Sequence, residues 1–220
     1  MTIQLGLVDD HIITRRGLKT YIELNKQIKV SLEAGNGKEL FQLLGQIDIL
    51  PDIILLDISM PKMNGFEAIQ LLQEKYPSIK VLIFSMITEE DTVIHMIRRG
   101  ASGFISKSSD PEIIVKAILT VAKAGYYIGN LTKKEFFRRN PYRAGSGSFI
   151  GNHPITPKEL EFIRLASSNL SYHEIAEYLK ISPKTLENYR DSLFHKLEIK
   201  NRAALVYYAF KSGLIDSFSS

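Results

Sequence analysis

An unbroken aliphatic run at residues 53–56 leads directly into an aspartate, and this feature restricts the fold more than any other. A short run of this kind predicts a strand buried on both faces, as in a parallel sheet covered by helices. Asp57 then stands at the carboxyl end of the strand, where open α/β sheets bind their ligands. Pro61 and Gly65 shape the following loop, and Phe66 opens an amphipathic segment. Asp57 is therefore either a polar turn residue or part of a site.

Strands and helices alternate through the first 125 residues. We expect strands at residues 4–8, 28–34, 53–56, 81–84 and 103–105. We expect helices at residues 12–24, 38–46, 66–75, 89–99 and 111–124. The last of these has Asp110 as its cap and Pro111 at its first position. This order predicts an α/β fold with a doubly wound, five-stranded parallel sheet.

Polar side chains follow four of the predicted strands at their carboxyl ends. They are Asp9, Asp10, Asp57, Ser85 and Lys107. Because parallel strands end at a common edge, we expect these side chains to converge. Clustered carboxylates repel one another, and a set of oxygen ligands without His or Cys suits Mg²⁺. A metal ion, a lysine and a hydroxyl around one carboxylate would stabilise a phosphoryl group during its transfer.

Composition narrows the class of protein further. There is no cysteine, which excludes disulfides, iron–sulfur clusters and thiolate zinc sites. No apolar run approaches the ~18 residues of a membrane span, and residues 1–10 lack the pattern of a signal peptide, so we expect a cytoplasmic protein. Residues 1–130 hold 14 basic and 15 acidic residues, and residues 131–220 hold 14 basic and 9 acidic ones. The basic C-terminal part favours a polyanionic partner, although an ordinary surface can carry the same charge.

Residues 126–153 are expected to form a linker. They include a Gly/Ser-rich stretch at 145–151 without hydrophobic periodicity, which is typical of a flexible connection. A short helix at residues 131–139 is expected before that stretch. The same region carries a basic run made of Lys133, Lys134, Arg138, Arg139 and Arg143.

From residue 156 onward the pattern predicts helices only. Capping boxes open helices at residues 157–168 and 172–179, and Pro183 starts a third helix at 183–197. Leucines recur on one face of this third helix, which is therefore core, and polar residues recur on another. A short helix, a tight turn at 180–182 and a longer helix with a polar face indicate a helix-turn-helix. A helical bundle with one solvated side shows the same pattern.

Four motifs in the first half resemble the receiver domain of two-component response regulators. They are LVDDH at 7–11, LLDISMPKMNG at 55–65, FSM at 84–86 and GASGFISKS at 100–108. The resemblance implies a flavodoxin-like fold in which Asp57 accepts a phosphoryl group from a histidine kinase. It also implies that Mg²⁺ is held by Asp9, Asp10, Asp57 and the backbone carbonyl of Ser59.

The same resemblance implies roles for three further residues. Lys107 would contact the phosphoryl group, and Ser85 and Phe104 would form a switch pair that moves on phosphorylation. That movement would repack residues 88–124 and favour pairing of receivers or release of the basic domain. Both effects are population shifts between two states.

Residues 155 to about 214 resemble the LuxR-type DNA-binding domain of the NarL/FixJ subfamily, an all-α domain of four helices. The matching elements are TPKE, EIA, IS, KTLENYR, KL and NR. The resemblance implies a recognition helix at 183–197 and a dimer surface at 201–211. Asn169 replaces a common glycine, so we expect a left-handed turn there.

Eight residues on or beside the recognition helix are candidates for DNA contact. They are Lys184, Glu187, Asn188, Arg190, Asp191, Lys196, Lys200 and Arg202. The long cations would contact phosphates, and Asn188 and Glu187 would read base edges. Glu187 stands where many members of the family carry lysine, and Asp191 adds a second acid.

The sequence therefore predicts a phosphorylation-controlled transcription factor without independent turnover, with domains at 1–125 and 154–220. Its expected partners are a histidine kinase, double-stranded DNA and, when phosphorylated or on DNA, a second copy, with no membrane involved. A phosphatase of the haloacid-dehalogenase class would need an aspartate where this chain has Ser59. An adaptor whose helical domain binds protein instead of DNA is the other alternative, supported only by Glu187 and Asp191.

Overall fold

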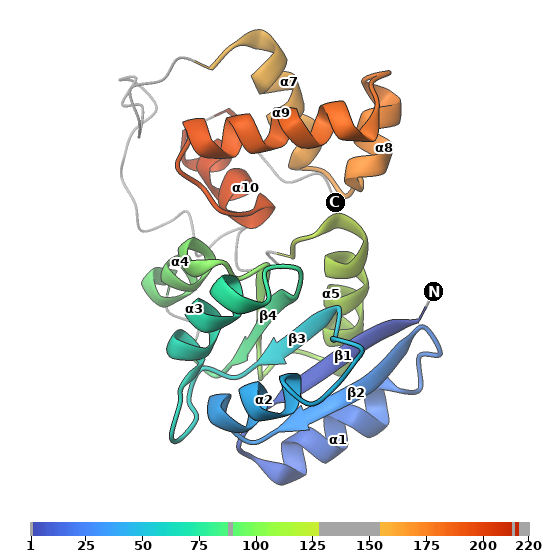
Figure 1. Cartoon of the computed structure of the whole chain (residues 1–220), viewed down its shortest axis with the longest axis vertical. Helices are drawn as coiled ribbons and strands as arrows, with labels where there is room; N and C mark the ends of the chain where they lie inside the picture. The colour runs from blue at the N-terminus through green and yellow to red at the C-terminus, as the bar shows by residue number, and fades with distance from the viewer. Residues whose placement is uncertain (1, 88–89, 128–154, 213, 216–220) are drawn as a thin grey trace.

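The computed structural model describes residues 2–87, 90–127, 155–212 and 214–215. The linker predicted at 126–153 lies almost entirely outside these residues, as do its basic run and the expected short helix at 131–139. The described part forms a sheet with helices on both faces, and a helical domain that lies above it in Figure 1.

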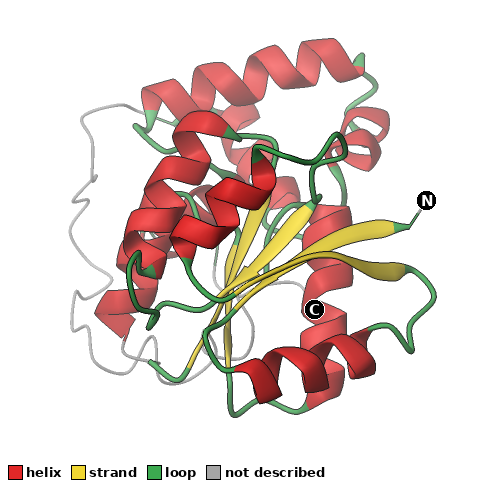
Figure 2. Cartoon of the chain, turned by 60° about the horizontal axis from the view of Figure 1, so that its bottom comes forward, coloured by secondary structure: helices red, strands yellow, loops and turns green. Residues whose placement is uncertain are grey.

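The sheet contains β1 (Ile3–Val8), β2 (Ile28–Ala34), β3 (Ile53–Leu56), β4 (Lys80–Ser85) and β5 (Gly103–Ser106). All neighbouring strands pair in parallel, in the order β2-β1-β3-β4-β5. The aliphatic run forms β3, and each of its four residues is buried because helices cover both sides of the sheet (Figure 2). The flavodoxin-like, doubly wound sheet predicted from the sequence is confirmed.

Two helices cover one face of the sheet and three cover the other. The helices are α1 (Ile12–Ile22), α2 (Gly37–Leu44), α3 (Gly65–Lys75), α4 (Glu90–Arg99) and α5 (Pro111–Ala124). Apolar residues of α1 and α5 form one core with the sheet, and those of α2, α3 and α4 form the other. Asp110 occupies the N-cap position of α5, but its side chain makes no cap hydrogen bond, contrary to expectation.

The described part of the helical domain contains α7 (Pro157–Ala166), α8 (Tyr172–Tyr178), α9 (Pro183–Lys196) and α10 (Arg202–Lys211). Both expected capping boxes are present, and the Ser182 side chain accepts a hydrogen bond from the Thr185 amide at the start of α9. Among the described residues of this domain, Lys180 and Glu198 are left-handed, both with φ of 54°, and Asn169 is not, so the expectation of a left-handed Asn169 is wrong. Lys180 lies in the tight turn between α8 and α9.

None of the helices among the described residues has the length and apolar character needed to cross a membrane.

The edge of the sheet at β5 is extended by the residues that leave α5. The Tyr127 amide donates to the Ser102 carbonyl at 2.9 Å, and the Phe104 amide donates to the Tyr127 carbonyl at 3.2 Å. A Cβ on Gly103 would lie only 2.1 Å from the Tyr127 carbonyl oxygen, so glycine is needed for this close approach. Tyr126 and Tyr127 therefore pack with the receiver, two residues beyond the boundary expected at 125.

The first capping box also holds a charge pair, which leads to a test of stability against pH. The Lys196 ammonium lies 2.8 Å from the Glu159 carboxylate. Burial alone would raise the pKa of Glu159, but the bonds from Lys196 and the Thr156 amide outweigh it and lower this pKa below its ordinary 4.5. A carboxyl group whose pKa is lower in the folded chain stabilises it above the unfolded pKa, and this stabilisation is lost as pH falls through the folded value.

We therefore expect Glu159→Gln, which keeps the cap acceptor but removes the charge, to lower the melting temperature of the helical domain at pH 6 to 7. The difference from wild type should shrink as the pH falls below about 4.5. Calorimetry across this pH range measures it, with Glu161→Gln, at an exposed acid of the same helix, as the control. An equal difference at every pH would contradict a role for the Glu159 charge.

Candidate functional site

Acidic side chains meet at the carboxyl ends of β1 and β3. The two strands are paired, and Asp9 and Asp57 directly follow their last residues, Val8 and Leu56. Both aspartates are buried, with 3% and 2% of their surface exposed. One ligand atom from each of Asp9, Asp10, His11 and Asp57 lies within 4.8 Å of the others. The structure thus brings together the three carboxylates that the sequence predicted.

Lys107 enters this acidic cluster from the end of β5. Its Nζ lies 2.8 Å from Oδ2 of Asp9 and 2.7 Å from Oδ2 of Asp57. Burial alone would lower the pKa of Lys107, but its close contacts with the Asp57 and Asp9 carboxylates outweigh this effect and raise the pKa. The ammonium is therefore charged at neutral pH and bridges two of the three carboxylates.

The cluster retains donor atoms that fit a divalent cation. Three carboxylates face one ammonium, so the site keeps an excess of negative charge. Asp9 Oδ2 and Asp10 Oδ1 are buried and accept no well-formed hydrogen bond, although each has a nitrogen within ion-pair distance. Hard oxygen ligands with free lone pairs are those that Mg²⁺ prefers.

The predicted switch residues, Ser85 and Phe104, are both buried. Ser85 is 1% exposed at the end of β4, and its Oγ accepts a hydrogen bond from the Ile87 amide at 3.2 Å. Its carbonyl accepts a bond from the Lys107 amide at 2.9 Å, which ties the end of β4 to Lys107. Phe104 is 2% exposed and belongs to the core between the sheet and α4. Ser85 is thus buried at the end of the strand next to β3, and Phe104 is buried on β5, the strand that leads to Lys107.

The loop after Asp57 is held close to the carboxylate. The Ser59 amide donates to Asp57 Oδ1 at 3.2 Å, which places Ser59 in the loop beside the acidic cluster. The Gly65 amide donates to the Ile58 carbonyl at 2.9 Å. A Cβ on Gly65 would lie 2.5 Å from the Asp57 carbonyl oxygen, so this tight return of the loop requires glycine.

Two residues at this site were not singled out from the sequence. His11 donates its amide to Asp9 Oδ1 at 2.9 Å, and its Nδ1 lies 2.9 Å from Asp10 Oδ1. Arg15, one turn further along α1, donates from Nη1 to the Asp9 carbonyl. His11 directly follows the two aspartates in the sequence, and this position could have indicated that it belongs to the site. Nothing local marks Arg15, whose partner lies in the preceding loop.

The polar face predicted for the third helix is exposed on α9. Lys184, Glu187, Asn188 and Asp191 are all exposed. Lys184 Nζ lies 2.8 Å from Glu187 Oε2, and Arg190 binds Asp191 Oδ1 from Nη2 at 2.7 Å. The Arg190 guanidinium also lies 5.3 Å from the centre of the Tyr172 ring on α8. The two acids thus each neutralise a cation of α9 in the free protein.

The remaining candidate cations differ in their placement. Lys200 is exposed beside α9, whereas Lys196 is engaged with Glu159 of α7. Arg202 is only 3% exposed and lies between the two domains. In this arrangement the Arg202 guanidinium cannot reach a DNA phosphate, which corrects its expected placement at the DNA surface.

Comparisons with known proteins agree with both halves of the chain. Residues 5–119 match the family model for the response regulator receiver domain, and residues 153–209 match that for bacterial regulatory proteins of the luxR family. The transcriptional regulatory protein DegU of Brevibacillus brevis is 32% identical over 227 residues, covering 97% of this chain and 95% of DegU.

Solved structures support the same assignment. A LuxR-family two-component response regulator from Aurantimonas sp. is 33% identical, with a TM-score of 0.54 over 58% of this chain and 89% of that one. The RcsB response regulator of Salmonella typhimurium has a TM-score of 0.58 at 23% identity, covering 94% of this chain and 97% of that one, which shows a common fold. This chain therefore belongs to the transcriptional response regulators of two-component systems that carry a LuxR-type helix-turn-helix domain.

Proposed function

We propose that Asp57 accepts a phosphoryl group from the phosphohistidine of a histidine kinase, and that this controls DNA binding by α9. The observation that carries the proposal is the double contact of Lys107 with Asp9 and Asp57 at 2.8 and 2.7 Å. A lysine held by two buried carboxylates at a sheet edge is placed to neutralise charge that arrives on one of them.

The reaction transfers one phosphoryl group between two side chains. A carboxylate oxygen of Asp57 forms a new P–O bond while the P–N bond to the kinase histidine breaks, and the histidine leaves with its electron pair. Mg²⁺ would neutralise the negative charge on the phosphoryl oxygens. The groups that would hold it are the carboxylates of Asp9, Asp10 and Asp57 and the backbone carbonyl of Ser59. The Lys107 ammonium orients an incoming phosphoryl group, and the Ser85 hydroxyl is a donor on the adjacent strand end.

The helical domain supplies the output. We assign α9 to the major groove, with Lys184, Lys200 and Arg190 at phosphates and Asn188 and Glu187 at base edges. The protein would bind as a homodimer when phosphorylated. Because its second partner is DNA, its place of action would be the cytoplasm.

The test is phosphorylation of Asp57 in vitro. Wild type incubated with Mg²⁺ and acetyl phosphate should gain an acid-labile phosphate, whereas Asp57→Asn should gain none, because the amide lacks the nucleophilic oxygen and its negative charge. Labelling is measured by intact-protein mass spectrometry, with Asp48→Asn, at an exposed bend, as the matched control. Labelling of Asp57→Asn to the level of Asp48→Asn would refute the assignment.

A further inference from the structure

Arg15 is a largely buried cation of α1 that contacts the chain between two of the clustered acids. Its Nη1 donates to the backbone carbonyl of Asp9, and only 16% of its side chain is exposed. That carbonyl belongs to the peptide group that joins Asp9 to Asp10. Because a peptide group is planar, fixing its oxygen also fixes the direction in which the chain enters Asp10. The bond therefore acts on the orientation of Asp10 as well as on Asp9.

Asp10 has less support from its neighbours than the other two acids of the cluster. Asp9 and Asp57 each donate a backbone amide to a strand carbonyl, at 3.1 and 2.9 Å, and each accepts a backbone amide at Oδ1. The one ion-pair partner described for Asp10 Oδ1 is Nδ1 of His11 at 2.9 Å, and 67% of the His11 side chain is exposed. An exposed partner of this kind contributes little. The orientation of Asp10 therefore depends mainly on its backbone.

The Arg15 guanidinium is also anchored to β2. Its Nε lies 3.7 Å from Oε2 of Glu33, and the Lys19 ammonium of the same helix lies 2.7 Å from Oε1 of Glu33. At 3.7 Å the contact of Arg15 with Glu33 is an ion pair and not a hydrogen bond. Among the described residues, the Asp9 carbonyl is therefore the one acceptor that the guanidinium hydrogen-bonds.

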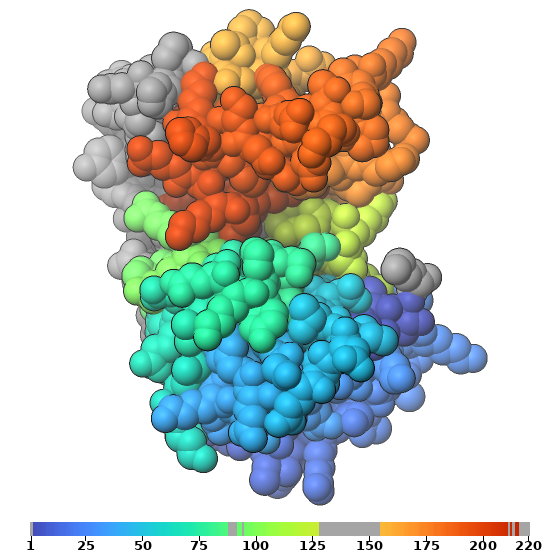
Figure 3. All heavy atoms as spheres, in the orientation of Figure 1, coloured from blue at the N-terminus to red at the C-terminus, as the bar shows by residue number. Residues whose placement is uncertain are grey.

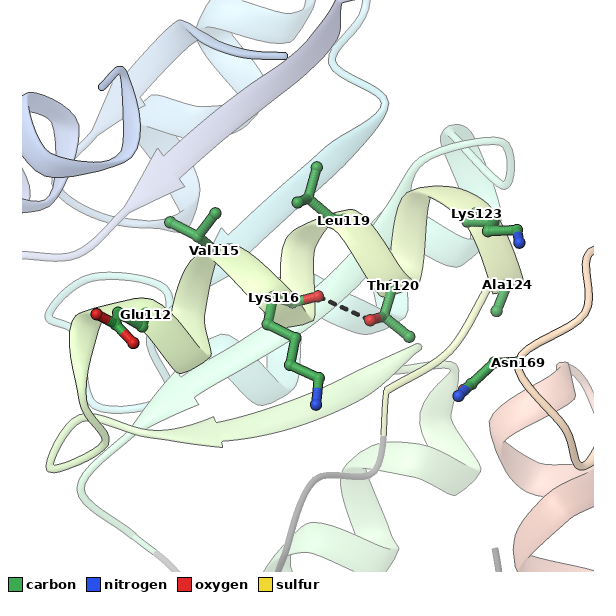
Figure 4. A pocket seen from close by; sticks show the side chains of 8 residues that line it. All are labelled: Glu112, Val115, Lys116, Leu119, Thr120, Lys123, Ala124 and Asn169. Carbon is green, nitrogen blue, oxygen red and sulfur yellow. Dashed lines mark hydrogen bonds between the residues drawn. The ribbon is translucent and has the colours of Figure 1, made fainter. Parts of the chain in front are cut away.

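The position of α1 separates this contact from the rest of the chain's polar features. In Figures 1 and 3, α1 lies at the lower end of the molecule and the helical domain at the upper end. Two other receiver cations, Lys116 and Lys123, line a groove on the outer face of α5 (Figure 4), and none of the clustered acids belongs to its described lining. A change at Arg15 is therefore expected to act locally.

We propose that Arg15 is a positioning residue for Mg²⁺, because its bond to the Asp9 carbonyl turns the Asp10 carboxylate toward the other two acids. Groups that orient metal ligands from outside the coordination shell change the affinity for the metal roughly ten- to a hundredfold. The described contacts of Arg15 include no carboxylate oxygen of the cluster. Arg15 should therefore affect the affinity for Mg²⁺ and not the rate of phosphoryl transfer once Mg²⁺ is bound.

The charge of Arg15 by itself predicts the opposite effect on Mg²⁺ binding. A cation beside an acidic cluster repels Mg²⁺, so its removal should tighten binding if only the charge matters. If the orientation of Asp10 matters more, removal of Arg15 should weaken binding. The sign of the change in affinity therefore separates the two roles.

The decisive variant is Arg15→Met in the full-length protein, because methionine keeps an unbranched apolar stem but has no N–H donor and no charge. We expect the dissociation constant for Mg²⁺ to rise roughly tenfold. It is measured from the rise in melting temperature during a Mg²⁺ titration at constant ionic strength, without a phosphodonor. Arg16→Met and Lys116→Ala, which remove exposed cations of α1 and α5, should bind Mg²⁺ at least as tightly as wild type.

Two further variants test whether Arg15 acts through the Asp9 carbonyl and Asp10. Arg15→Lys keeps the charge and one donor, and it should recover most of the affinity for Mg²⁺. In an Asp10→Ala background, Arg15→Met should have little further effect on the affinity, because the carboxylate that it positions is gone. A general loss of stability would instead add to the effect of Asp10→Ala.

The labelling reaction gives a second readout, which rests on the function proposed for Asp57. In Arg15→Met the Mg²⁺ concentration for half-maximal labelling by acetyl phosphate should rise, while the rate at saturating Mg²⁺ should equal that of wild type. If Asp57 of wild type is not labelled at all, the proposed function fails, and the Mg²⁺ titration still decides the role of Arg15.

Three results would overturn the positioning role. They are binding of Mg²⁺ by Arg15→Met as tight as by Arg16→Met, an undiminished effect of Arg15→Met in the Asp10→Ala background, and absence of Mg²⁺ binding in wild type. Should Arg15→Met not melt cooperatively, Arg15→Gln, whose side chain is shorter than that of arginine, takes its place, with Arg16→Gln as its control.

Discussion

Replacing Lys107 by alanine should destabilise the receiver by roughly 3 kcal/mol in the absence of divalent cations, because it leaves buried acids without their counter-charge. Lys107 Nζ is within 2.8 Å of both Asp9 and Asp57, and these aspartates are 3% and 2% exposed. Removing one partner of a buried ion pair costs about 3 to 5 kcal/mol of stability. We use the lower end of this range because 13% of the Lys107 side chain is exposed. Urea denaturation followed by circular dichroism measures the loss.

Mg²⁺ should reverse much of this loss. In wild type the ammonium occupies space between carboxylates that would hold the metal, so the variant should bind Mg²⁺ at least as tightly as wild type does. The variant should also fail to dimerise or bind DNA after treatment with acetyl phosphate. Lys116→Ala, at an exposed position of α5, is the control. Equal urea midpoints for Lys107→Ala and Lys116→Ala, with and without Mg²⁺, would rule out the bridging role.

Glu187→Lys should increase affinity for random DNA by at least tenfold at low salt, which is the second large effect that we expect. The substitution adds a cation to the exposed face of α9 and frees Lys184, which is otherwise bound to Glu187 at 2.8 Å. Two additional phosphate contacts would steepen the slope of log affinity against log salt by about two units. Fluorescence anisotropy with a labelled duplex, measured over a salt series, gives both quantities.

The same variant decides what Glu187 does on a specific site. If the carboxylate accepts a hydrogen bond from a cytosine amino group, the lysine variant should lose preference for its own operator while gaining general affinity. If it only repels phosphates, every sequence should gain equally. Asn188→Ala provides the comparison, since loss of a base contact should cost roughly 1–3 kcal/mol on the operator and little elsewhere. If both variants bound DNA like wild type, the assignment of α9 to the major groove would be wrong.

The acidic site was predictable because the carboxyl ends of parallel strands all lie at the same edge of a sheet. Once Asp9, Asp57 and Lys107 are assigned to the carboxyl ends of strands, the sheet itself brings them to one edge. The aliphatic run of β3 and the alternation of strands and helices support the assignment of these residues to strand ends. Both features can be recognised from the local sequence pattern. The helix caps at Thr156 and Ser171 were predictable for the same reason, since their partners lie three residues away.

The placement of Arg202 could not be predicted in this way. Its receiver partner, the Ala124 carbonyl, lies 78 residues earlier in the chain, and an arginine close to the predicted recognition helix looks like another DNA contact. Whether a side chain is buried between two domains depends on tertiary packing, and the local spacing of apolar and polar residues does not show it. The charge pairs of α9 were hidden for a related reason, because i,i+3 spacing permits a pair such as Lys184–Glu187 but does not show whether the side chains meet.

The pairing of Tyr127 along β5 has a consequence for the solubility of the receiver. β5 is an outer strand, and such strands offer unpaired amides and carbonyls to the edges of other molecules. Tyr127 forms backbone hydrogen bonds with the Phe104 amide and the Ser102 carbonyl, so the chain covers part of the outer edge of its own sheet. A receiver cut after residue 125 would lose this cover and should aggregate edge to edge, whereas one that ends after Tyr127 should stay in solution.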